Sequence, residues 1–485
     1  MSLELKDPGL LRQQAYVNGQ WCEADSGART EIFNPANAEK IGSVPNMGRD
    51  ETRRAIEAAQ SAQPAWRALT AKARAQLLRN WFELILANQE DLARIMTAEQ
   101  GKPLAEARGE IAYAASFIEW FAEEAKRAYG DLIPAHAMDK RILVQKEPVG
   151  VTAAITPWNF PSAMITRKAG PALAVGCAMV LKPAPQTPFS ALALVALAER
   201  AGIPAGLLSV IPADVAASRE VGAELCDNPI VRKLSFTGST AVGITLMQQC
   251  APTLKKLSLE LGGNAPFIVF DDADLDAAVE GAIISKYRNA GQTCVCANRL
   301  YVQDGVYDAF AAKLQVAVAK LRVGNGMQEG ITTGPLINAE AVAKVERHLR
   351  DALDKGATLV AGGKRLGGNF FEPTIVSGVT AEMAVAREET FGPLAPLFRF
   401  SDEAEVIRQA NDTEFGLAAY FYARDLGRVF RVAEALEYGM VGINTGVIST
   451  EVAPFGGMKS SGLGREGSKY GLDEYLEIKY LCLGV

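Results

Sequence analysis

The sequence predicts an α/β protein built from two doubly wound parallel domains, with a small additional β element for oligomerisation. Three observations predict this class. A chain of 485 residues is too long for a single hydrophobic core. Helical and strand patterns alternate regularly from residue 167 to residue 261, and a second alternation begins at residue 264. At the C-terminus, residues 473–483 alternate polar and apolar side chains, as an edge strand does.

The first part of the chain combines a helical region with two strands. Residues 51–129 are rich in Ala, Leu, Arg and Glu, with apolar residues three and four positions apart, which is the helical period. Residues 141–146 and 149–156 have strand patterns, and the second is nearly all apolar and β-branched. We expect 141–146 to pair with the C-terminal strand and to join subunits into a homodimer or homotetramer.

Helices and strands then alternate four times, which is typical of a doubly wound parallel sheet that binds ligands at the carboxyl ends of its strands. The predicted pairs are helix 167–176 with strand 178–182, helix 189–202 with strand 207–211, helix 216–227 with strand 233–237, and helix 241–250 with strand 256–261. The second α/β block has a looser pattern. Its predicted elements are strand 266–270, helix 275–289, strand 299–302, and helices 306–321, 339–355, 403–411 and 426–436.

The composition excludes several classes of partner and location. Apolar residues make up 49% and charged residues 22%, which is typical of a globular chain. The net charge of −6 argues against nucleic acid as a partner, because phosphate binding needs a basic surface. Residues 148–166 are uncharged, but their three prolines favour a buried strand and turn over a membrane span. Residues 1–21 lack a basic start with an apolar run, so we expect no secretory signal and a cytoplasmic protein.

Cysteine and histidine usage limits the chemistry. The seven cysteines are scattered apart from Cys294 and Cys296, and no spacing fits a zinc site or a disulfide framework, so we expect no metal. The two histidines, His136 and His348, lie near no serine or cysteine cluster. A Ser-His-Asp or Cys-His enzyme is therefore disfavoured, and a general base is expected to be a carboxylate.

One glycine motif is misleading. Gly462-Leu-Gly464-Arg-Glu-Gly467 matches the dinucleotide fingerprint letter for letter. However, it does not open a strand–helix–strand unit and it lies near the C-terminus. A tight glycine turn is the better interpretation.

Four segments place polar or charged groups among apolar residues at predicted strand ends. They are Pro157-Trp-Asn-Phe-Pro161, Phe236-Thr-Gly-Ser-Thr240, Leu259-Glu-Leu-Gly-Gly263 and Gly291-Gln-Thr-Cys294. Together with Glu388-Glu-Thr-Phe-Gly-Pro393 and Pro454-Phe-Gly-Gly457, they resemble, in order and approximate spacing, the motifs of the aldehyde dehydrogenase superfamily. The resemblance covers essentially the whole chain. It implies an aldehyde dehydrogenase-like fold and NAD(P)-dependent oxidation of an aldehyde to an acid.

The resemblance also implies a division of the chain. Residues 1–127 and 149–259 would form the dinucleotide-binding domain and residues 260–443 the catalytic domain. Residues 128–148 and 472–485 would supply oligomerisation strands. Residues 444–471 would form a substrate-side loop and a return segment.

Three residues are expected to carry the chemistry. Cys294 is the candidate nucleophile, because a thiol attacks a carbonyl readily and its thioester then hydrolyses; an inert buried thiol is the alternative. Glu260 lies in an apolar strand, where burial would raise its pKa and suit it to deprotonate water; a buried ion pair is the alternative. The resemblance implies that the Asn159 amide and the Cys294 backbone N–H bind the oxyanion, whereas alone Asn159 would more often form a turn.

The resemblance assigns a cofactor site over the first sheet. Gly238-Ser-Thr-Ala-Val-Gly243 is the superfamily's variant phosphate turn, with Ser239 at a helix N-terminus facing the pyrophosphate. The expected cofactor-binding residues are Thr156, Pro157, Trp158, Lys182, Pro185, Gly238, Ser239, Gly243, Leu261, Glu389 and Phe391. At Pro185, NAD-preferring relatives often have a glutamate that would repel a 2′-phosphate. We therefore expect NADP as the preferred cofactor and NAD as the alternative.

Within the superfamily, segments 162–167, 287–296 and 444–449 resemble succinate-semialdehyde dehydrogenases. Arg167 and Arg288 would bind the distal carboxylate of a small-molecule semialdehyde, and Ser449 would add a hydroxyl. Glutarate semialdehyde stays open, because one methylene is discriminated by only about 1–3 kcal/mol, and so does a broader range of aldehydes. A cysteine thioesterase or esterase and a non-catalytic binding protein are remote alternatives.

Cys296 is a candidate partner for Cys294 in a reversible redox switch. In an extended segment, side chains two residues apart lie on one face, and their Cα atoms would be near the upper limit for a disulfide. Bridging would require the loop to bend, and a strained disulfide of this kind suits regulation. The alternative is that Cys296 only fills space beside the loop.

Overall fold

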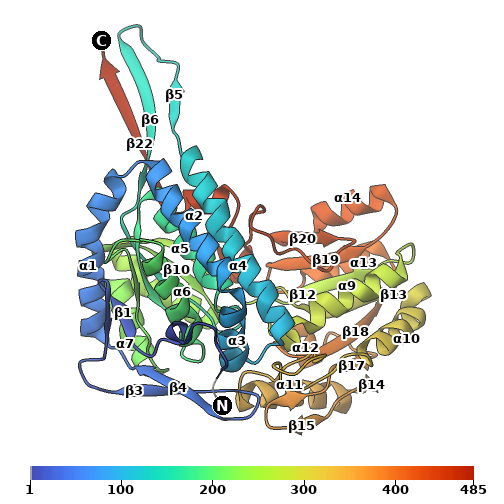
Figure 1. The fold of residues 1–485 in the computed structure, drawn as a ribbon. Helices are drawn as coiled ribbons and strands as arrows, with labels where there is room; N and C mark the ends of the chain where they lie inside the picture. The colour runs from blue at the N-terminus through green and yellow to red at the C-terminus, as the bar shows by residue number, and fades with distance from the viewer. Residues whose placement is uncertain (1–2) are drawn as a thin grey trace.

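The protein is described by a computed structural model that covers residues 3–485; Met1 and Ser2, with which the predicted domain 1–127 begins, lie outside the described residues. Two large sheets, each covered by helices, form the body of the molecule, and a three-stranded sheet projects from it (Figure 1). Among residues 3–485, no helix combines the length and apolarity needed to cross a membrane.

The first sheet has eight strands in the order β2-β1-β9-β8-β7-β10-β11-β21. Its strands are β1 (Ala15–Val17), β2 (Gln20–Cys22), β7 (Val151–Ile155), β8 (Ala178–Lys182), β9 (Leu208–Val210), β10 (Val231–Thr237), β11 (Lys256–Glu260) and β21 (Gly462–Leu463). The five strands from β9 to β11 are mutually parallel. The chain builds outward from β7 to β9 and then returns to place β10 on the other side of β7. This reversal is the switch point of a doubly wound sheet.

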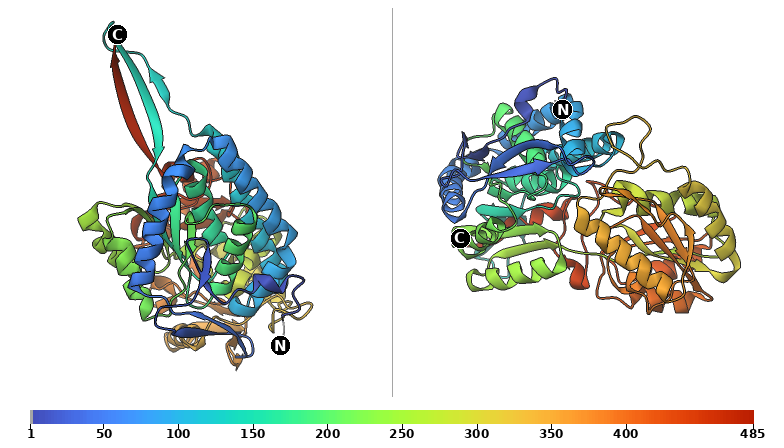
Figure 2. Two further views of the ribbon diagram at one scale, coloured as in Figure 1. Left: turned by 60° about the vertical axis from the view of Figure 1, so that its left-hand side comes forward. Right: turned by 90° about the horizontal axis from the view of Figure 1, so that it is seen from below.

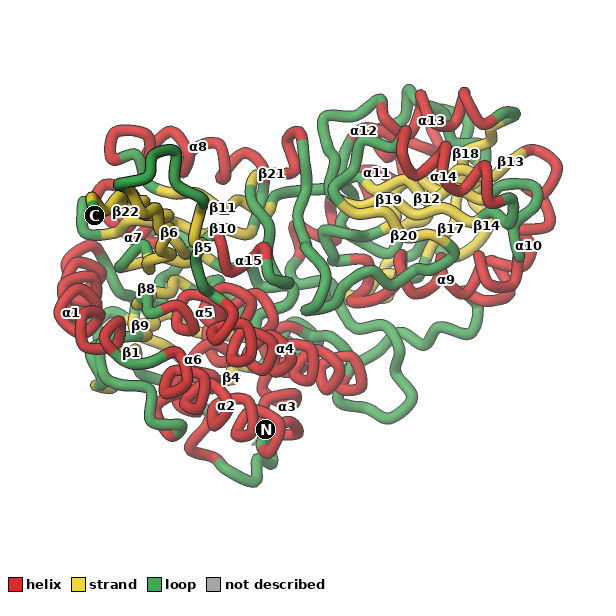
Figure 3. Tube along the Cα trace, turned by 90° about the horizontal axis from the view of Figure 1, so that it is seen from above, coloured by secondary structure: helices red, strands yellow, loops and turns green. Residues whose placement is uncertain are grey.

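The helices that connect these strands lie on both faces of the sheet. Figure 3 shows α5 and α6 on one side and α8 on the other. These helices are α5 (Ala163–Val175), α6 (Pro188–Arg200), α7 (Ala217–Asp227) and α8 (Thr240–Cys250). α1 (Arg49–Ala68) packs beside α7 against β8. Helices α2 (Ala71–Ala87), α3 (Gln89–Gln100) and α4 (Leu104–Glu124) add an outer layer over α5 and α6. Nearly every side chain of α5 and α6 is buried because they lie between the sheet and this layer.

The second sheet has seven strands in the order β14-β17-β18-β13-β12-β19-β20 and is doubly wound around β12. Its strands are β12 (Ala265–Val269), β13 (Ala297–Gln303), β14 (Thr358–Ala361), β17 (Thr374–Ser377), β18 (Leu394–Phe400), β19 (Ala418–Tyr422) and β20 (Met440–Ile443). Figure 3 shows α9 and α10 on one side and α13 and α14 on the other. The helices are α9 (Leu275–Tyr287), α10 (Tyr307–Val318), α11 (Ala339–Asp354), α12 (Ala384–Arg387), α13 (Glu403–Asn411) and α14 (Leu426–Ala435).

The projecting sheet confirms the predicted pairing of the C-terminal strand. β22 (Leu476–Gly484) runs antiparallel to β6 (Lys140–Pro148), and β5 (Asp131–Ile133) pairs with the other edge of β6. Figure 2 shows this arm extending away from the helices, with the C-terminus at its tip.

Some elements were not predicted, including β14, β17, β18, β19 and β20 of the second sheet, and the helices predicted over 275–289 and 306–321 were too long. The short hairpins β1–β2, β3–β4 (Arg29–Phe33 and Lys40–Pro45) and β15–β16 (Arg365–Gly367 and Phe370–Phe371) have no clear periodicity. The helix predicted over 275–289 ends at Tyr287, because Asn289 and Ala290 adopt left-handed φ values of 52° and 55°. The glycine motif at 462–467 is a turn, as expected: its three glycines have positive φ, and Gly462 pairs with Glu260 at a sheet edge.

Candidate active site

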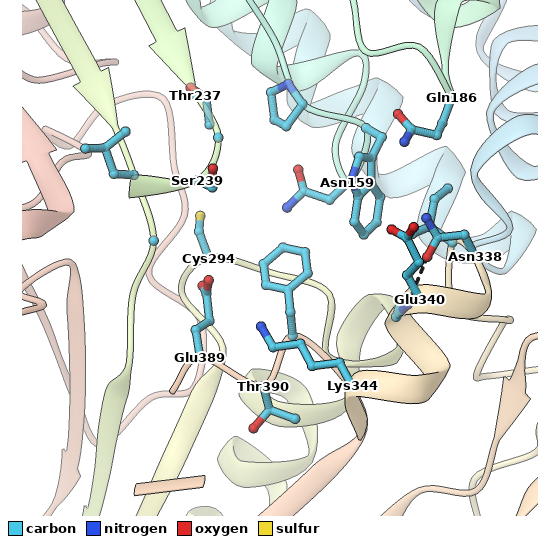
Figure 4. Close-up of a pocket in the computed structure, with 18 of the residues that line it drawn as sticks. Asn159, Gln186, Thr237, Ser239, Cys294, Asn338, Glu340, Lys344, Glu389 and Thr390 are labelled. Atoms are coloured by element: carbon cyan, nitrogen blue, oxygen red, sulfur yellow. Dashed lines mark hydrogen bonds between the residues drawn. The ribbon is translucent and has the colours of Figure 1, made fainter. Parts of the chain in front are cut away.

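The candidate site lies at the switch point of the first sheet, where that sheet faces the second. The chain leaving β7 supplies Trp158 and Asn159, and the chain leaving β10 supplies Gly238 and Ser239. The connection into β13 of the second sheet supplies Cys294. These segments meet because the carboxyl ends of parallel strands lie at one edge of a sheet. Figure 4 shows the side chains of Asn159, Ser239 and Cys294 directed into one cavity.

Two adjoining cavities share residues at this edge. One of about 430 Å³ contains Cys294. It is lined by Pro157, Trp158, Asn159, Met164, Gln186, Thr237, Gly238, Ser239, Leu261, Gly262, Cys294, Ile337, Asn338, Glu340, Ala341, Lys344, Glu389, Thr390 and Phe391. The other, of about 780 Å³, extends over the sheet between α7 and α8. Its lining includes Thr156, Pro157, Trp158, Lys182, Pro185, Gln186, Ser218, Arg219, Gly222, Gly238, Ser239 and Val242.

Cys294 is half-buried and lines the smaller cavity. Burial raises the pKa of its thiol to about 12; the charge of Arg167 opposes this shift, and those of Glu260 and Glu389 add to it. In this environment the thiol is protonated at neutral pH. A base must therefore take its proton before the sulfur attacks a carbonyl.

Asn159 is buried, and its amide lies in the same cavity (Figure 4). Its Nδ2 donates to the backbone carbonyl of Gln292 at 3.2 Å, two residues before the cysteine. An amide nitrogen carries two N–H groups. One is therefore anchored, and the other is available to an oxygen bound next to Cys294.

Glu260 ends β11 in a buried position, and neither of its carboxylate oxygens has a hydrogen-bond partner. Oε1 lies against the backbone of Gly456, where a Cβ atom would come within 2.9 Å. Burial and the charge of Glu466 raise its pKa well above the ordinary value. The predicted direction of this shift is confirmed, and the alternative of a buried ion pair is not what the structure contains.

A buried charge cluster behind Glu260 was not predicted. Glu466 accepts hydrogen bonds from Lys168 Nζ and Arg167 Nε, and Ser235 Oγ lies 3.4 Å from it. Although burial opposes it, the two cations lower the pKa of Glu466. A sequence signal existed, because adjacent Arg167 and Lys168 interrupt an otherwise apolar helix. Their partner lies about 300 positions later, inside the glycine turn, and spacing alone could not identify it.

The residues expected to hold the cofactor line the two cavities, with one exception. Lys182 is buried beside Pro185, and burial lowers the pKa of its ammonium to about 8. Glu389 Oε1 accepts from Gly263 N at 3.2 Å, and burial raises its pKa to about 7. Trp158 meets Phe391 edge to face, with ring centroids 5.6 Å apart.

Gly243 is the exception, because it lines neither cavity. A Cβ atom there would lie 2.4 Å from Leu261 Cδ2. Gly243 therefore allows α8 to approach Leu261, which itself lines the smaller cavity.

The three expected substrate-binding residues lie outside the lining of the smaller cavity. Arg167 is committed to Glu466 through Nε, but its buried Nη2 has no partner. Arg288 stacks over Phe160 at 5.2 Å and forms no ion pair or hydrogen bond within residues 3–485. Ser449 is half-buried.

Tyr113 is a further residue that sequence patterns did not reveal. Its buried hydroxyl has no hydrogen-bond partner. Burial raises its pKa, and the charges of Arg167 and Arg288 oppose that shift, so the hydroxyl lies among these cations. It is one of many polar residues along α4, and nothing in the helical pattern distinguishes it.

Cys296 was expected in an extended segment, and this expectation is wrong. Residues 293–296 form a turn in which Cys296 N donates to Thr293 O at 3.1 Å. The thiol is buried and lies 3.5 Å from Lys286 Nζ. Within the described chain, no group of three or more His, Cys, Asp or Glu side chains could hold a metal ion.

Comparisons with known proteins agree with this geometry. Residues 21–481 match the profile of the aldehyde dehydrogenase family. The chain is 73% identical to the glutarate-semialdehyde dehydrogenase of Pseudomonas putida (strain KT2440) over 483 residues, covering 100% of both chains. It is 71% identical to the NADP(+) succinate-semialdehyde dehydrogenase of Escherichia coli (strain K12), again over 100% of both. The crystal structure of an E. coli NADP-dependent enzyme, 71% identical, superimposes with a TM-score of 0.98 over 99% of this chain and 100% of that one. The chain belongs to the aldehyde dehydrogenase family.

Proposed function

We propose that the protein oxidises succinate semialdehyde to succinate through a thioester on Cys294, with NADP as the preferred cofactor and NAD as the alternative. The overall reaction consumes aldehyde, water and oxidised cofactor and yields carboxylate, reduced cofactor and two protons. One observation carries the proposal: Cys294 shares a cavity with Asn159 and Glu389, and this cavity opens onto the larger one between α7 and α8.

The larger cavity fits a dinucleotide. Its volume of about 780 Å³ is adequate for a nucleotide half, and Ser239 precedes the first turn of α8, where backbone N–H groups favour phosphate. The buried hydroxyl of Thr237 has no partner at the same edge. Glu389 would hold the nicotinamide ribose, and Trp158 and Phe391 would flank the nicotinamide. When bound, NADP accepts the hydride.

The domain division supports this arrangement. We propose that residues 1–127 and 149–259 form the cofactor domain and that residues 260–443 form the catalytic domain. The two large sheets and the cavities between them support this division.

The preference for NADP rests on charge. Pro185 brings no carboxylate to the part of the cavity that holds Lys182. Ser218 and Arg219 of α7 line the same cavity, and Arg219 is exposed and forms no ion pair within the described chain. An arginine and a lysine near one ribose favour a 2′-phosphate.

The chain's own residues account for the covalent steps. The Cys294 thiol gives its proton to a water molecule as its sulfur attacks the aldehyde carbon, and the oxyanion accepts hydrogen bonds from the free N–H of Asn159 and from the Cys294 backbone N–H. Loss of hydride from that carbon leaves a thioester on sulfur. Glu260 then takes a proton from water, which attacks the thioester carbon and releases the acid. Its raised pKa makes the carboxylate a stronger base than an ordinary glutamate.

The carboxylate of the substrate has several available donors. Arg288 has no ion-pair partner within the described residues. Arg167 Nη2 and the Tyr113 hydroxyl are buried and have no hydrogen-bond partner, and Ser449 would add a hydroxyl. The activities named for the two relatives, glutarate- and succinate-semialdehyde dehydrogenase, support a semialdehyde with a distal carboxylate. Glutarate semialdehyde remains the alternative, because the same donors would accept a carboxylate one methylene further away.

The projecting arm supports a homo-oligomer. Its apolar side chains are strongly exposed: Leu132 by 75%, Met138 by 96% and Ile478 by 73%. Exposed apolar strands of this length usually pair or pack with another chain. Light scattering of the full chain and of an Ile478→Lys variant tests this, and an unchanged dimer or tetramer in the variant would argue against the arm.

The proposed function is tested by measuring kcat/KM for succinate semialdehyde, glutarate semialdehyde and an uncharged aldehyde of similar length, each with NADP and NAD. Succinate semialdehyde with NADP is expected to be the best pair. In Arg288→Met, kcat/KM should fall at least tenfold for both acid semialdehydes and should change little for the uncharged aldehyde. Equal losses would mean that Arg288 is structural. Hydrolysis of thioesters without reduced cofactor would favour an esterase.

A further inference from the structure

A buried polar network contacts Asn159 and lies outside the lining of the cavity. Its centre is Lys102, in the connection between α3 and α4, whose side chain is 1% exposed. Lys102 Nζ pairs with Glu110 of α4 and donates to the backbone carbonyl of Asn159 at 2.7 Å. The ammonium also lies 4.0 Å from the centroid of the Phe160 ring.

A second donor reaches the same carbonyl from the loop that precedes the nucleophile. Asn289 Nδ2 lies 3.1 Å from the Asn159 carbonyl oxygen and 3.2 Å from the Gln292 carbonyl oxygen. Gln100 fixes the orientation of this amide, because its Nε2 donates to Asn289 Oδ1 at 3.0 Å. Asn289 thus joins the backbone of the amide residue to the backbone two positions before Cys294.

The Gln292 carbonyl is also the acceptor that anchors the Asn159 side chain. When one N–H of a planar amide is fixed, the direction of the other is fixed as well. The network therefore holds both ends of Asn159. Lys102 and Asn289 hold its backbone, and the Gln292 carbonyl holds its side chain.

This arrangement is costly for the fold. A buried lysine–glutamate pair contributes less than well-packed apolar residues would. Asn289 and Ala290 occupy the left-handed region, with φ near 52° and 55°, where residues other than glycine are rarely found. Such costs concentrate where a geometry must be held for function.

We propose that Lys102 and Asn289 are positioning residues that aim the free N–H of Asn159 at the oxyanion formed on Cys294. The inference rests on the proposed oxyanion role of Asn159. Neither residue lines the cavity, so both act through Asn159 and the Gln292 carbonyl. Small errors of position are enough to slow a reaction, since a displacement of about 1 Å can cost about 10²-fold.

A double-mutant cycle tests the proposal with the intact enzyme. The variants are Lys102→Met, Asn159→Ala and their combination, and the readout is the single-turnover rate of reduced-cofactor formation with succinate semialdehyde. We expect the single-turnover rate to fall about 10²–10³-fold in Asn159→Ala and about tenfold or more in Lys102→Met. In the Asn159→Ala background, Lys102→Met should cost almost nothing further, because the group it positions is gone.

Two controls separate positioning from folding. Lys102→Met/Glu110→Gln removes the charge pair together, which keeps Glu110 from being left unpaired, and it should show the same kinetic loss. Lys233→Met removes another fully buried lysine, bound to Ser258 and Glu474, and should leave the rate unchanged. Alkylation of Cys294 by iodoacetamide builds no oxyanion, so its rate should be equal in all variants.

The outcomes are distinguishable. If Lys102→Met lowers the single-turnover rate by the same factor in the wild type and in Asn159→Ala, then Lys102 does not act through Asn159 and has only a general structural role. Slowed alkylation in Lys102→Met would likewise overturn the positioning role, because the thiol itself would then be disturbed. A wild-type rate in Asn159→Ala would instead refute the oxyanion role in the proposed function.

Discussion

Replacing Gly243 with Ala is predicted to weaken cofactor binding by displacing Leu261. Gly243 lies in the first turns of α8, and an added Cβ would be 2.4 Å from Leu261 Cδ2 and 2.9 Å from Cδ1. Ordinary carbon contacts are about 3.5–4.0 Å, so the Leu261 side chain must withdraw by roughly 1 Å. The open space beside it is the smaller cavity, which Leu261 lines.

The substitution should affect both the stability of the fold and the affinity for the cofactor. Ala in a helix is more favourable than Gly by about 1 kcal/mol, and overpacking a buried site costs about 1–3 kcal/mol. The free energy of unfolding should therefore fall by no more than about 2 kcal/mol. The cavity, by contrast, loses room where the nicotinamide is proposed to lie, and an increase of about tenfold in KM for NADP corresponds to about 1.4 kcal/mol.

The assay is steady-state KM for NADP, together with denaturant unfolding of the same samples. Gly243→Ala/Leu261→Ala removes both Cδ atoms and should recover most of the affinity. Gly109→Ala in α4, where no atom lies within 4 Å of the added Cβ, is the matched control and should not change KM. If the double variant keeps the full loss, then Gly243 contacts the cofactor directly and the packing explanation is wrong.

Three further predictions concern the cofactor and the second cysteine. Pro185→Glu should shift the kcat/KM ratio from NADP toward NAD by at least tenfold, because a carboxylate repels the 2′-phosphate; a wild type that already prefers NAD widely would contradict this explanation. Burial lowers the pKa of Lys182 to about 8, so its side chain is a charged ammonium below that pH and a neutral amine above it. KM for NADP should therefore rise between about pH 7 and 9 while KM for NAD stays flatter, and equal pH profiles would argue against a phosphate contact. Peroxide followed by dithiothreitol should inactivate and restore the wild type, whereas Cys296→Ser should lose activity irreversibly; identical behaviour would mean that Cys296 only fills space.

Most of the fold could be predicted because its elements carry strong local patterns. β7 and β8 of the first sheet are short, largely apolar runs, and the helices of this domain are long enough for periodicity to be clear. The short hairpins near the N-terminus were missed because three-residue strands such as Ala15–Val17 have no readable period. The end of α9 was misplaced because the left-handed turn at Asn289 depends on contacts with distant residues such as Glu106 and Gln100.

Some residues of the candidate site could be predicted from the sequence, and others could not. Cys294, Glu260 and Asn159 lie in contiguous motifs, so the sequence indicates them. Glu466 and Lys102 act through partners that are far apart in the chain, and only the fold brings them together. Individual polar residues in a helix or a glycine turn carry no local signal of such a partner.

In the proposed mechanism, Cys294 forms a thioester whose hydrolysis depends on Glu260. This mechanism is tested most directly by mixing the Glu260→Gln variant with NADP and succinate semialdehyde in a stopped-flow instrument and measuring intact mass after the reaction. We expect a rapid burst of one reduced cofactor per subunit, then little turnover, with an acyl group retained on Cys294. Cys294→Ala should give neither the burst nor the acyl group. Steady turnover by Glu260→Gln near the wild-type rate, with no retained acyl group, would contradict the claim.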